Sequence, residues 1–283
     1  MKLYADYKNM FENIVQNGTN YLKKYPDIKS MVIGLSGGID SALTAAIARE
    51  ICDRQYLKYK LIGVSIPIVS NKKSEIELAE EVGEGFCHRF KEVKSIDKVF
   101  RIFGRFIKTK TVAEKIRIGN IKARLRMLVL YDMAHRNKGI VLSTDNLSEF
   151  NLGFWTLHGD VGDLGFIQSL WKTEVYGLSN YLCEKHKKIM LDTSIVHIRT
   201  YMYRRAALIK AINAVPTDGL GVTASDFDQL GVKSYQKADK LLIEYINTGD
   251  KKLESHPVIK RHLKYAFKRE NPYNIPRENV IGK

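Results

Sequence analysis

The stretch Gly34-Leu35-Ser36-Gly37-Gly38-Ile39-Asp40-Ser41 decides the fold of this chain. It follows a short apolar run, residues 31–33, and precedes an alanine-rich run, residues 42–48, so the pattern predicts a strand, a turn and a helix. The glycines allow positive φ angles and leave room for a ligand close to the main chain. A helix N-terminus favours an anion, and a carboxylate beside a phosphate indicates Mg²⁺ between them. The turn therefore predicts a site for a nucleotide phosphate and its metal.

This turn differs from the common phosphate loop GxxxxGK[ST], because no lysine precedes Ser41. The pattern SGGxDS at a first strand-to-helix turn resembles the loop of the ATP-pyrophosphatase enzymes. These enzymes cleave ATP between its α- and β-phosphates and pass through an adenylated substrate. The alternative interpretation is a glycine-rich turn without a ligand, which gives Asp40 and the two serines no role.

Composition narrows the class of protein. The 283 residues, 45% of them hydrophobic, are enough for one large α/β domain or two small ones. No apolar run approaches the length of a membrane helix, and we expect no secretory signal because the N-terminal residues lack its apolar segment. Cys52, Cys87 and Cys183 form no CxxC pair and no zinc spacing, so we expect reduced thiols in a cytoplasmic protein.

The chain is basic, with 46 Lys and Arg residues against 31 Asp and Glu residues, which gives a net charge of +15. Such a balance is typical of proteins that bind nucleic acids and of proteins that handle several phosphates. The basic residues are spread along the chain, with mild clustering at residues 260–269 and no long basic tail. The charge alone does not exclude a nucleic-acid partner, but small phosphate-bearing substrates explain it as well.

Apolar periodicity and turn residues predict the order of the elements. We expect helices over residues 4–25, 41–52, 71–86, 96–107 and 112–136, and strands over residues 31–33, 59–66, 91–93 and 139–143. Asn71 or Ser74 is the expected N-cap of the third helix. The alternation predicts an α/β fold with a doubly wound, mostly parallel sheet and helices on both faces. Ligands of such sheets bind beyond the carboxyl ends of the strands, where residues 36–41 and 143–145 lie.

A second informative stretch begins at Ser143-Thr144-Asp145-Asn146-Leu147-Ser148-Glu149 and continues through residues 153–163 and 171–176. Glu149 is a candidate for the second carboxylate on the metal that Asp40 holds. Lys172 opens a helix and is a candidate clamp on a phosphate, because its ammonium is a mobile point charge. Asp160, on a glycine-flanked loop, is a candidate for receiving a small cation or a polar nucleophile. The alternative interpretation is a solvated acidic loop followed by a lysine at a helix start.

Taken in order, the segments GLSGGIDSA, GNIKARLRM (residues 119–127), STDNLSE, TLHGD and WKTEVY resemble NAD synthetase. Residues 215–220, followed by residues 226–228 and 230–232, resemble the substrate loop of that family. The resemblance extends from about residue 31 to residue 277. It implies a Rossmann-like fold of the adenine nucleotide alpha hydrolase type in a single domain over residues 1–283. That domain comprises an N-terminal helix (1–25), an ATP-pyrophosphatase core (31–182) and a helical C-terminal part with the substrate loop (183–283).

The resemblance also implies an activity. The family amidates deamido-NAD (nicotinic acid adenine dinucleotide) to NAD in a reaction that uses ATP and Mg²⁺. The carboxylate of deamido-NAD attacks the α-phosphorus of ATP, which gives an NAD-adenylate and pyrophosphate, and ammonia then displaces AMP. Both steps need charge stabilisation, which a metal ion, a lysine and loop N–H groups supply. The family works as a homodimer.

Carried over position by position, the resemblance gives each candidate residue an expected role. The expected catalytic residues are Asp40, Glu149, Lys172 and Asp160, with Asp40 and Glu149 as Mg²⁺ ligands and Asp160 at the ammonia site. ATP is expected to contact Gly34, Leu35, Ser36, Gly37, Gly38, Ile39, Asp40, Ser41, Thr144, Lys172 and Thr217. Deamido-NAD is expected to contact Arg124, Leu157, Asp163 and Lys268.

The chain departs from the family's pattern in several places. Leu157 stands where many ammonia-dependent members have a lysine, and Phe267 replaces the usual histidine before Lys268. We expect ammonia, free or from a separate amidase, as the nitrogen donor, because the length leaves no room for a glutamine-hydrolysing domain. The segment 183–214 is longer than usual and fits a lid, an oligomer contact or a basic surface. The apolar stripe of the helix around Arg124 fits either a dimer surface or packing on the sheet.

Two other functions remain as alternatives from the sequence. One is a tRNA-modifying adenylating enzyme with the same loop, which the positive charge favours and the STDNLSE and TLHGD segments disfavour. The other is a non-catalytic nucleotide-binding protein on the same fold. Against it, Asp40, Glu149 and Lys172 are all present, and a binding protein without catalysis has no need of this set.

Overall fold

The computed structural model describes all residues except 57, 70, 105–110, 193–194, 217–224 and 282–283. Its centre is a five-stranded sheet in which every pair is parallel and the order is β3-β2-β1-β4-β5. The strands are β1 (Ser30–Gly34), β2 (Lys60–Ser65), β3 (Arg89–Glu92), β4 (Gly139–Ser143) and β5 (Leu164–Gly165). The predicted α/β class with a parallel sheet is confirmed.

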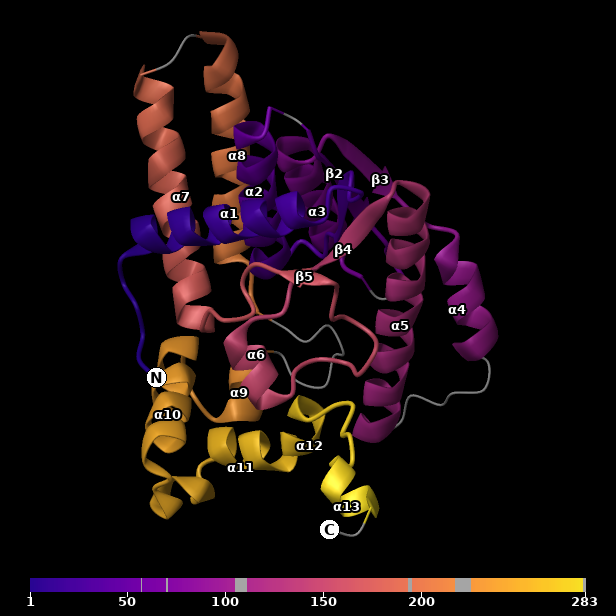
Figure 1. The fold of residues 1–283 in the computed structure, drawn as a ribbon, viewed down its shortest axis with the longest axis vertical. Helices are drawn as coiled ribbons and strands as arrows, with labels where there is room; N and C mark the ends of the chain where they lie inside the picture. The colour runs from indigo at the N-terminus through magenta and orange to yellow at the C-terminus, as the bar shows by residue number, and fades with distance from the viewer. Residues whose placement is uncertain (57, 70, 105–110, 193–194, 217–224, 282–283) are drawn as a thin grey trace.

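Helices cover both faces of the sheet, because alternate residues of each strand point to opposite sides. Met31 and Ile33 of β1 belong to a core cluster shared with α1 (Tyr7–Lys24), α2 (Ile39–Arg54) and α3 (Lys73–Phe86). Val32 belongs to a second cluster, shared with α4 (Ile96–Gly104) and α5 (Val112–Arg136). Figure 1 shows these two helical layers on either side of the strands.

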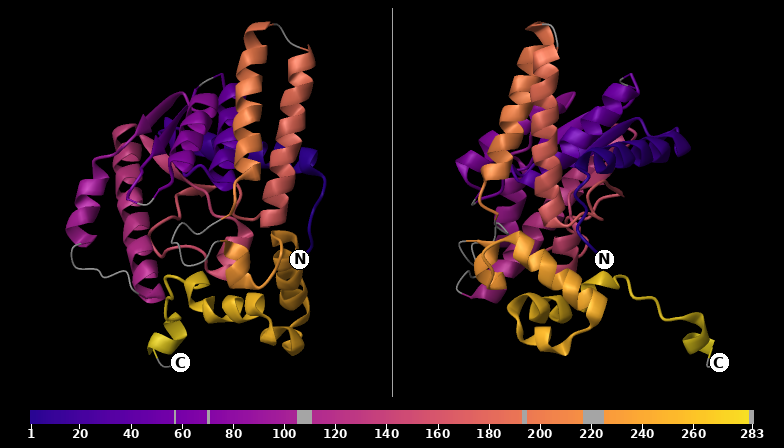
Figure 2. Two further views of the ribbon diagram at one scale, coloured as in Figure 1. Left: turned by 180° about the vertical axis from the view of Figure 1, so that it is seen from behind. Right: turned by 90° about the vertical axis from the view of Figure 1, so that its left-hand side faces the viewer.

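A long helical hairpin follows the sheet. It consists of α7 (Lys172–Asp192) and α8 (Ile195–Asn213), and its far end projects beyond the rest of the molecule (Figures 1 and 2). The near half of α8 packs on α2 and α3, where Arg204 is buried and donates to the carbonyl of Gly85 at 2.8 Å. Arg204 therefore belongs to the packing of the hairpin on the body. Helix α7 runs across residue 183, and the division of the chain at that residue stays a prediction.

The C-terminal helices lie beneath the carboxyl edge of the sheet (Figure 1). Their apolar cluster includes Leu152, Trp171, Leu230, Leu242 and Ile259. The elements here are α6 (Leu147–Leu152), α9 (Asp226–Leu230), α10 (Tyr235–Thr248), η1 (Lys251–Ser255), α11 (Pro257–Lys264), α12 (Ala266–Arg269) and α13 (Arg277–Ile281). None of the helices that the structure describes is both long and apolar enough to cross a membrane.

Two details of the sequence-based elements need correction. The N-cap of α3 is Lys72, and neither Asn71 nor Ser74 holds that position. The Lys72 N–H donates to the Glu75 carboxylate at 3.1 Å, while the Asn71 side chain accepts from the Ile68 N–H at 3.1 Å. Strand β5 was not predicted, because two residues are too short for a periodic pattern.

Candidate functional site

The candidate site lies at the carboxyl ends of β1 and β4, between which the strand order reverses. Residues 35–38 lead from β1 into α2. Gly37 has a φ of +81°, and a Cβ there would lie 2.5 Å from the carbonyl oxygen of Glu75, so the turn requires glycine. Helix α2 begins at Ile39, and its N-cap residue, Gly38, provides no side-chain cap. Its first N–H groups therefore suit an anion.

Two serine hydroxyls hold the shape of this turn. The Ser36 Oγ accepts from the Gly38 N–H at 3.2 Å, and the Ser41 Oγ donates to the Gly38 carbonyl at 3.0 Å. The two hydroxyl oxygens lie 3.3 Å apart. An anion bound at the turn would meet a loop whose conformation is already fixed.

The ammonium of Lys172 lies between two carboxylates. It donates to the Asp40 Oδ2, from the start of α2, and to the Glu149 Oε1 at 2.9 Å, from α6. Lys172 is 4% exposed. Burial opposes its charge, but Asp40 and Glu149 outweigh that effect and raise the pKa of the ammonium. Three residues from distant parts of the sequence thus form one charged cluster.

Burial also affects Glu149. It raises the pKa of this carboxyl group to about 7, Asp40 contributes in the same direction, and the Lys172 ammonium opposes the shift. The neighbouring Asp145 behaves similarly, because burial and the charges of Asp160 and Glu149 raise its pKa. Both raised pKa values show that this environment disfavours additional negative charge, so a cation bound beside these carboxyl groups would favour their ionised forms.

Asn146 is a member of the cluster that the sequence reasoning missed. Its Oδ1 accepts from the Glu149 N–H at 3.0 Å and caps α6, while its Nδ2 donates to the Asp40 Oδ1 at 2.9 Å. The first bond could have been inferred, since asparagine is a favoured N-cap three residues before an acidic residue. The second joins residues 106 positions apart, and no local pattern indicates it.

Asp160 is fixed on the loop between α6 and β5. Both of its oxygens accept from the Thr156 N–H, at 2.8 and 3.0 Å, and the Thr156 hydroxyl donates to Asn120 of α5 at 2.8 Å. Burial raises the pKa of Asp160 to about 6, although the Thr156 N–H, Lys268 and Arg124 oppose the shift. At neutral pH this carboxyl group is therefore mostly ionised.

Two of the residues expected to contact deamido-NAD, Arg124 and Lys268, donate hydrogen bonds to the loop that carries Asp160. Arg124 of α5 donates from Nε to the carbonyl of Leu157 at 3.2 Å, so these two predicted residues are in contact. Lys268 of α12 donates to the carbonyls of Gly153, at 2.8 Å, and Trp155. Arg124, Leu157 and Lys268 thus all lie at the loop that carries Asp160, which the sequence alone did not establish.

The Asp163 carboxylate accepts hydrogen bonds from within the protein. It accepts from the Tyr131 hydroxyl at 2.9 Å and from the Val141 N–H at 2.8 Å, which ties the end of the loop to α5 and β4. Thr144 is half-buried directly after β4. Thr217 lies outside the described residues. The ligand contacts predicted for these three residues stay predictions.

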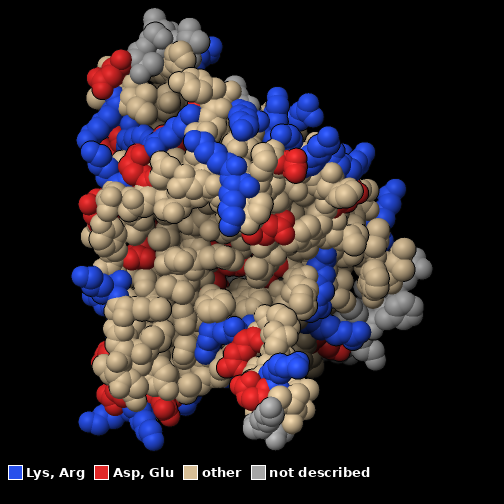
Figure 3. Space-filling model, viewed as in Figure 1, with Lys and Arg blue, Asp and Glu red and all other residues tan. Residues whose placement is uncertain are grey.

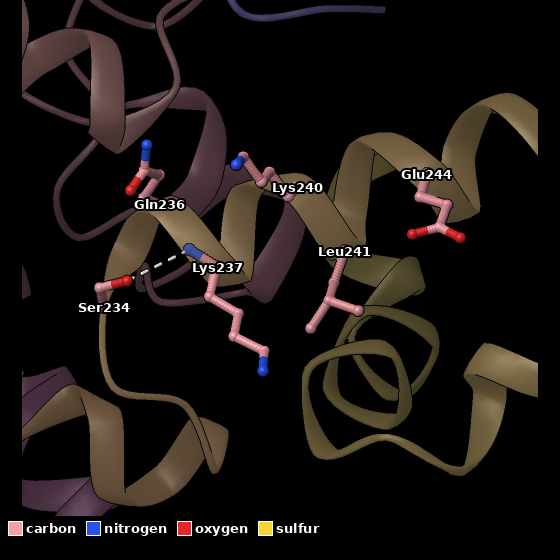
Figure 4. Close-up of a pocket in the computed structure, with 6 residues that line it drawn as sticks. All are labelled: Ser234, Gln236, Lys237, Lys240, Leu241 and Glu244. Atoms are coloured by element: carbon pink, nitrogen blue, oxygen red, sulfur yellow. Dashed lines mark hydrogen bonds between the residues drawn. The ribbon is translucent and has the colours of Figure 1, made fainter.

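Figure 3 shows a hollow near the middle of this face, between the sheet and the C-terminal helices, with acidic atoms inside it and basic atoms at its rim. A separate hollow of about 290 Å³ lies on the outer face of α10 (Figure 4). It is lined by Ser234, Gln236, Lys237, Lys240, Leu241 and Glu244. None of these is a predicted site residue, so this second hollow is distinct from the candidate site.

A family model described as NAD synthase matches residues 10–272. The chain belongs to the NAD synthase family. A relative from Thermoplasma acidophilum, described as an NH(3)-dependent NAD(+) synthetase, is 30% identical over 275 residues, which are 96% of this chain and 99% of the relative. The turn after β1 and the cluster around Lys172 both lie within the part that the family model matches.

Solved structures agree on the fold of this member of the NAD synthase family. The NMN synthetase from Francisella tularensis superposes with a TM-score of 0.72 at 24% identity, covering 96% of this chain and 99% of its own. The NH3-dependent NAD synthetase from Campylobacter jejuni superposes with a TM-score of 0.66 at 23% identity, covering 96% of this chain and 100% of its own.

Proposed function

We propose that this protein amidates deamido-NAD to NAD, with ammonia as nitrogen donor and with ATP cleaved to AMP and pyrophosphate. Membership of the NAD synthase family supports the reaction class. The observation that carries the assignment to particular residues is the Lys172 ammonium between Asp40 and Glu149, beside the turn after β1. Such a charge cluster, next to a helix start that suits phosphate, fits adenylation of a carboxylate.

In the first step the carboxylate of deamido-NAD attacks the α-phosphorus of ATP, and pyrophosphate leaves. Negative charge builds on the leaving phosphates as the bond breaks. The start of α2 and the serine hydroxyls at residues 36 and 41 bind the phosphates, and the Lys172 ammonium neutralises part of the charge. We assign Arg124, Leu157, Asp163 and Lys268 to the binding of deamido-NAD; their positions around the loop of Asp160 support this for three of them.

In the second step the nitrogen of ammonia bonds to the acyl carbon and AMP leaves with the bonding electrons. The nitrogen must lose a proton for the amide to form. Asp160 is suited to this step, because its pKa of about 6 keeps it mostly ionised at neutral pH. It attracts an ammonium ion and accepts a proton from the nitrogen.

Asp40 and Glu149 fit a Mg²⁺ ion that would arrive with ATP. Their side chains are 17% and 19% exposed, and both point at one cation, Lys172. No group of three or more His, Cys, Asp or Glu side chains within the described parts of the chain forms a metal site by itself. Mg²⁺ in nucleotide sites commonly takes one or two carboxylates and completes its shell with phosphate oxygens and water. When bound, the ion would offset phosphate charge.

We also propose a cytoplasmic homodimer. The outward face of α5 supports the dimer, since Leu128 and Tyr131 are 67% and 42% exposed there. Large exposed apolar side chains gathered on one helix are typical of an interface. Cys52, Cys87 and Cys183 are free thiols, which supports a reducing compartment.

The first experiment is to incubate the protein with ATP, Mg²⁺, deamido-NAD and an ammonium salt, and to follow NAD and AMP together. We expect equal amounts of both products, and no NAD when glutamine replaces ammonium. Asp40→Asn and Glu149→Gln should abolish turnover, whereas Glu244→Gln on the outer face of α10 should not. Absence of both NAD formation and ATP cleavage would contradict the proposal and would favour the tRNA-modifying or non-catalytic alternative.

A further inference from the structure

A buried carboxylate outside the predicted site joins the elements that carry it. Asp239 of α10 is 0% exposed. Its Oδ1 accepts from the Ser148 hydroxyl at 2.5 Å, and its Oδ2 accepts from the Thr173 N–H at 2.9 Å and the Thr173 hydroxyl at 2.6 Å. Three donors from two other helices therefore converge on one side chain.

The partners of Asp239 are chain neighbours of the residues proposed to act on ATP. Ser148 precedes Glu149 in α6, and Thr173 follows Lys172 in α7. The Ser148 hydroxyl also accepts from the Lys172 N–H at 2.7 Å. The Asp239 carboxylate, the Ser148 hydroxyl and the first N–H groups of α7 thus form a single hydrogen-bonded unit.

The same helix touches the side chain of Lys172. The ring of Tyr235, one turn before Asp239 on α10, lies with its centroid 5.5 Å from the Lys172 Nζ. An anion at the start of α7 is favourable, because the first N–H groups of a helix have no partner within it. Asp239 fulfils this role from another part of the chain, whereas ordinary caps come from the residue that precedes the helix.

We propose that Asp239 is a positioning residue, which sets Lys172 and Glu149 at the separation that adenylation requires. It touches neither ATP nor deamido-NAD, and it acts through the Ser148 hydroxyl and through the main-chain N–H and hydroxyl of Thr173. The proposal rests on the proposed function in one respect, namely that Lys172 and Glu149 act on ATP. The competing interpretation is a buried carboxylate that stabilises the fold and has no specific effect on catalysis.

The first test compares Asp239→Asn with Glu244→Gln, which neutralises an exposed carboxylate on the same helix. The amide NH₂ of an asparagine at residue 239 cannot accept a hydrogen bond, so at least one of the three donors from Ser148 and Thr173 loses its acceptor. We expect kcat for pyrophosphate release to fall about 10- to 100-fold, the effect of a small misplacement of a catalytic group. The KM for ATP should change little, and Glu244→Gln should match the wild type. A rise in KM alone would overturn the proposal.

A double-mutant cycle separates positioning from general stability. Single-turnover pyrophosphate release is measured for the wild type, Asp239→Asn, Lys172→Ala and the double variant, at a temperature where each is folded. If Asp239 acts through Lys172, its substitution should add little once that ammonium is gone. An equal fold-loss in both backgrounds would mean that the two residues act independently, which would overturn the proposal.

Gentler variants keep the test valid if Asp239→Asn does not fold. Thr173→Val removes one of the three donors and leaves Asp239 in place, whereas Thr173→Ser retains the hydroxyl. We expect Thr173→Val to lower kcat and Thr173→Ser to restore most of it. Equal rates in the two variants would contradict the role of the hydroxyl and with it the hydrogen-bonded unit.

Hydrogen exchange tests the unit without any reaction. Peptides covering residues 147–152 and 171–176 should exchange faster in Asp239→Asn than in the wild type, while peptides from α3 should not change. If the wild type made no NAD, the proposed function would be wrong, but the exchange experiment would still test whether Asp239 holds the starts of α6 and α7. Unchanged exchange at both helix starts would overturn the inference whatever the activity.

Discussion

At the scale of single residues, the raised pKa of Asp160 predicts how the stability of the protein depends on pH. Its pKa of about 6 exceeds the ordinary aspartate value near 4, so the folded protein binds a proton that the unfolded chain has already released between these limits. Stability therefore falls as the pH rises from about 4 to about 6.

Asp160→Asn should remove this part of the pH dependence. We expect the free energy of unfolding of the variant, relative to the wild type, to increase between pH 4 and pH 7 by an amount on the order of 2 kcal/mol. Urea unfolding at four pH values measures it, with the exposed Asp132→Asn as control. A difference that does not vary with pH would show that the pKa of Asp160 is ordinary.

The same substitution separates the two steps of the proposed reaction. Asp160→Asn should slow amide formation about 100-fold, the usual size of a lost acid–base contribution, and should leave adenylation nearly unchanged. Rapid-quench measurement of pyrophosphate and NAD in one experiment gives both rates. An equal loss in both steps would place Asp160 outside the ammonia site.

Lys172 compensates two carboxylates, and its removal should destabilise the fold. Lys172→Met leaves Asp40 and Glu149 without their ammonium, which we expect to lower the free energy of unfolding by about 3 kcal/mol. Added Mg²⁺, without nucleotide, should recover more stability in this variant than in the wild type. Urea titrations with and without Mg²⁺ test this, and Lys240→Met, on the outer face of α10, is the matched control. A loss no larger than that of the control would contradict the compensation.

At the scale of elements, the end of α6 depends on a glycine whose replacement is costly. Gly153 and Gly249 both end helices with positive φ angles, of 67° and 63°. A Cβ at Gly153 would lie 2.5 Å from the Cβ of Tyr265, whereas nothing lies within 4 Å of a Cβ at Gly249. Substitution of Gly249 therefore measures backbone strain alone, whereas substitution of Gly153 measures strain together with steric overlap.

We expect Gly249→Ala to cost about 1 kcal/mol of stability, the strain of a left-handed alanine. Gly153→Ala should cost at least about 2 kcal/mol and should also reduce activity, because α6 carries Glu149. Urea unfolding and the NAD assay measure the two effects. Equal stability losses in the two variants would mean that Tyr265 moves aside freely.

Elements with strong local patterns could be predicted from the sequence, and elements defined by distant partners could not. The predicted bounds of α5 and β4 are those observed, because a long apolar periodicity and a β-branched run are local signals. The rule that parallel strands end at one edge predicts that residues 36–41 and 143–145 lie together, whereas the roles of Glu149 and Lys172 beside Asp40 are expected from the resemblance to NAD synthetase. The bonds of Asn146 to Asp40 and of Ser148 to Asp239 span 106 and 91 positions, and one sequence carries no signal of such pairs.

At the scale of the whole molecule, the proposed dimer gives a direct measurement. Leu128→Lys places a charge in the exposed apolar face of α5, and burying an unpaired charge in an interface is strongly unfavourable. We expect the mass in solution, measured by light scattering, to fall from that of a dimer to that of a monomer. Leu191→Lys, at the projecting end of α7 and 78% exposed, should remain a dimer. Persistence of the dimer in Leu128→Lys would exclude this face as the interface.

The cluster around Lys172 also has a consequence for the order in which the protein assembles during synthesis. The contact between Asp40 and Lys172 joins residues 132 positions apart, and Asp239 belongs to a helix that is synthesised later still. Contacts of such sequence separation form late, because long loops must close first. A nascent chain that has reached residue 182 can form most of the sheet, but the Ser148 hydroxyl and the Thr173 N–H and hydroxyl lack their shared carboxylate until α10 leaves the ribosome. Nucleotide-binding ability should therefore appear as a late event of translation, well after the sheet has formed.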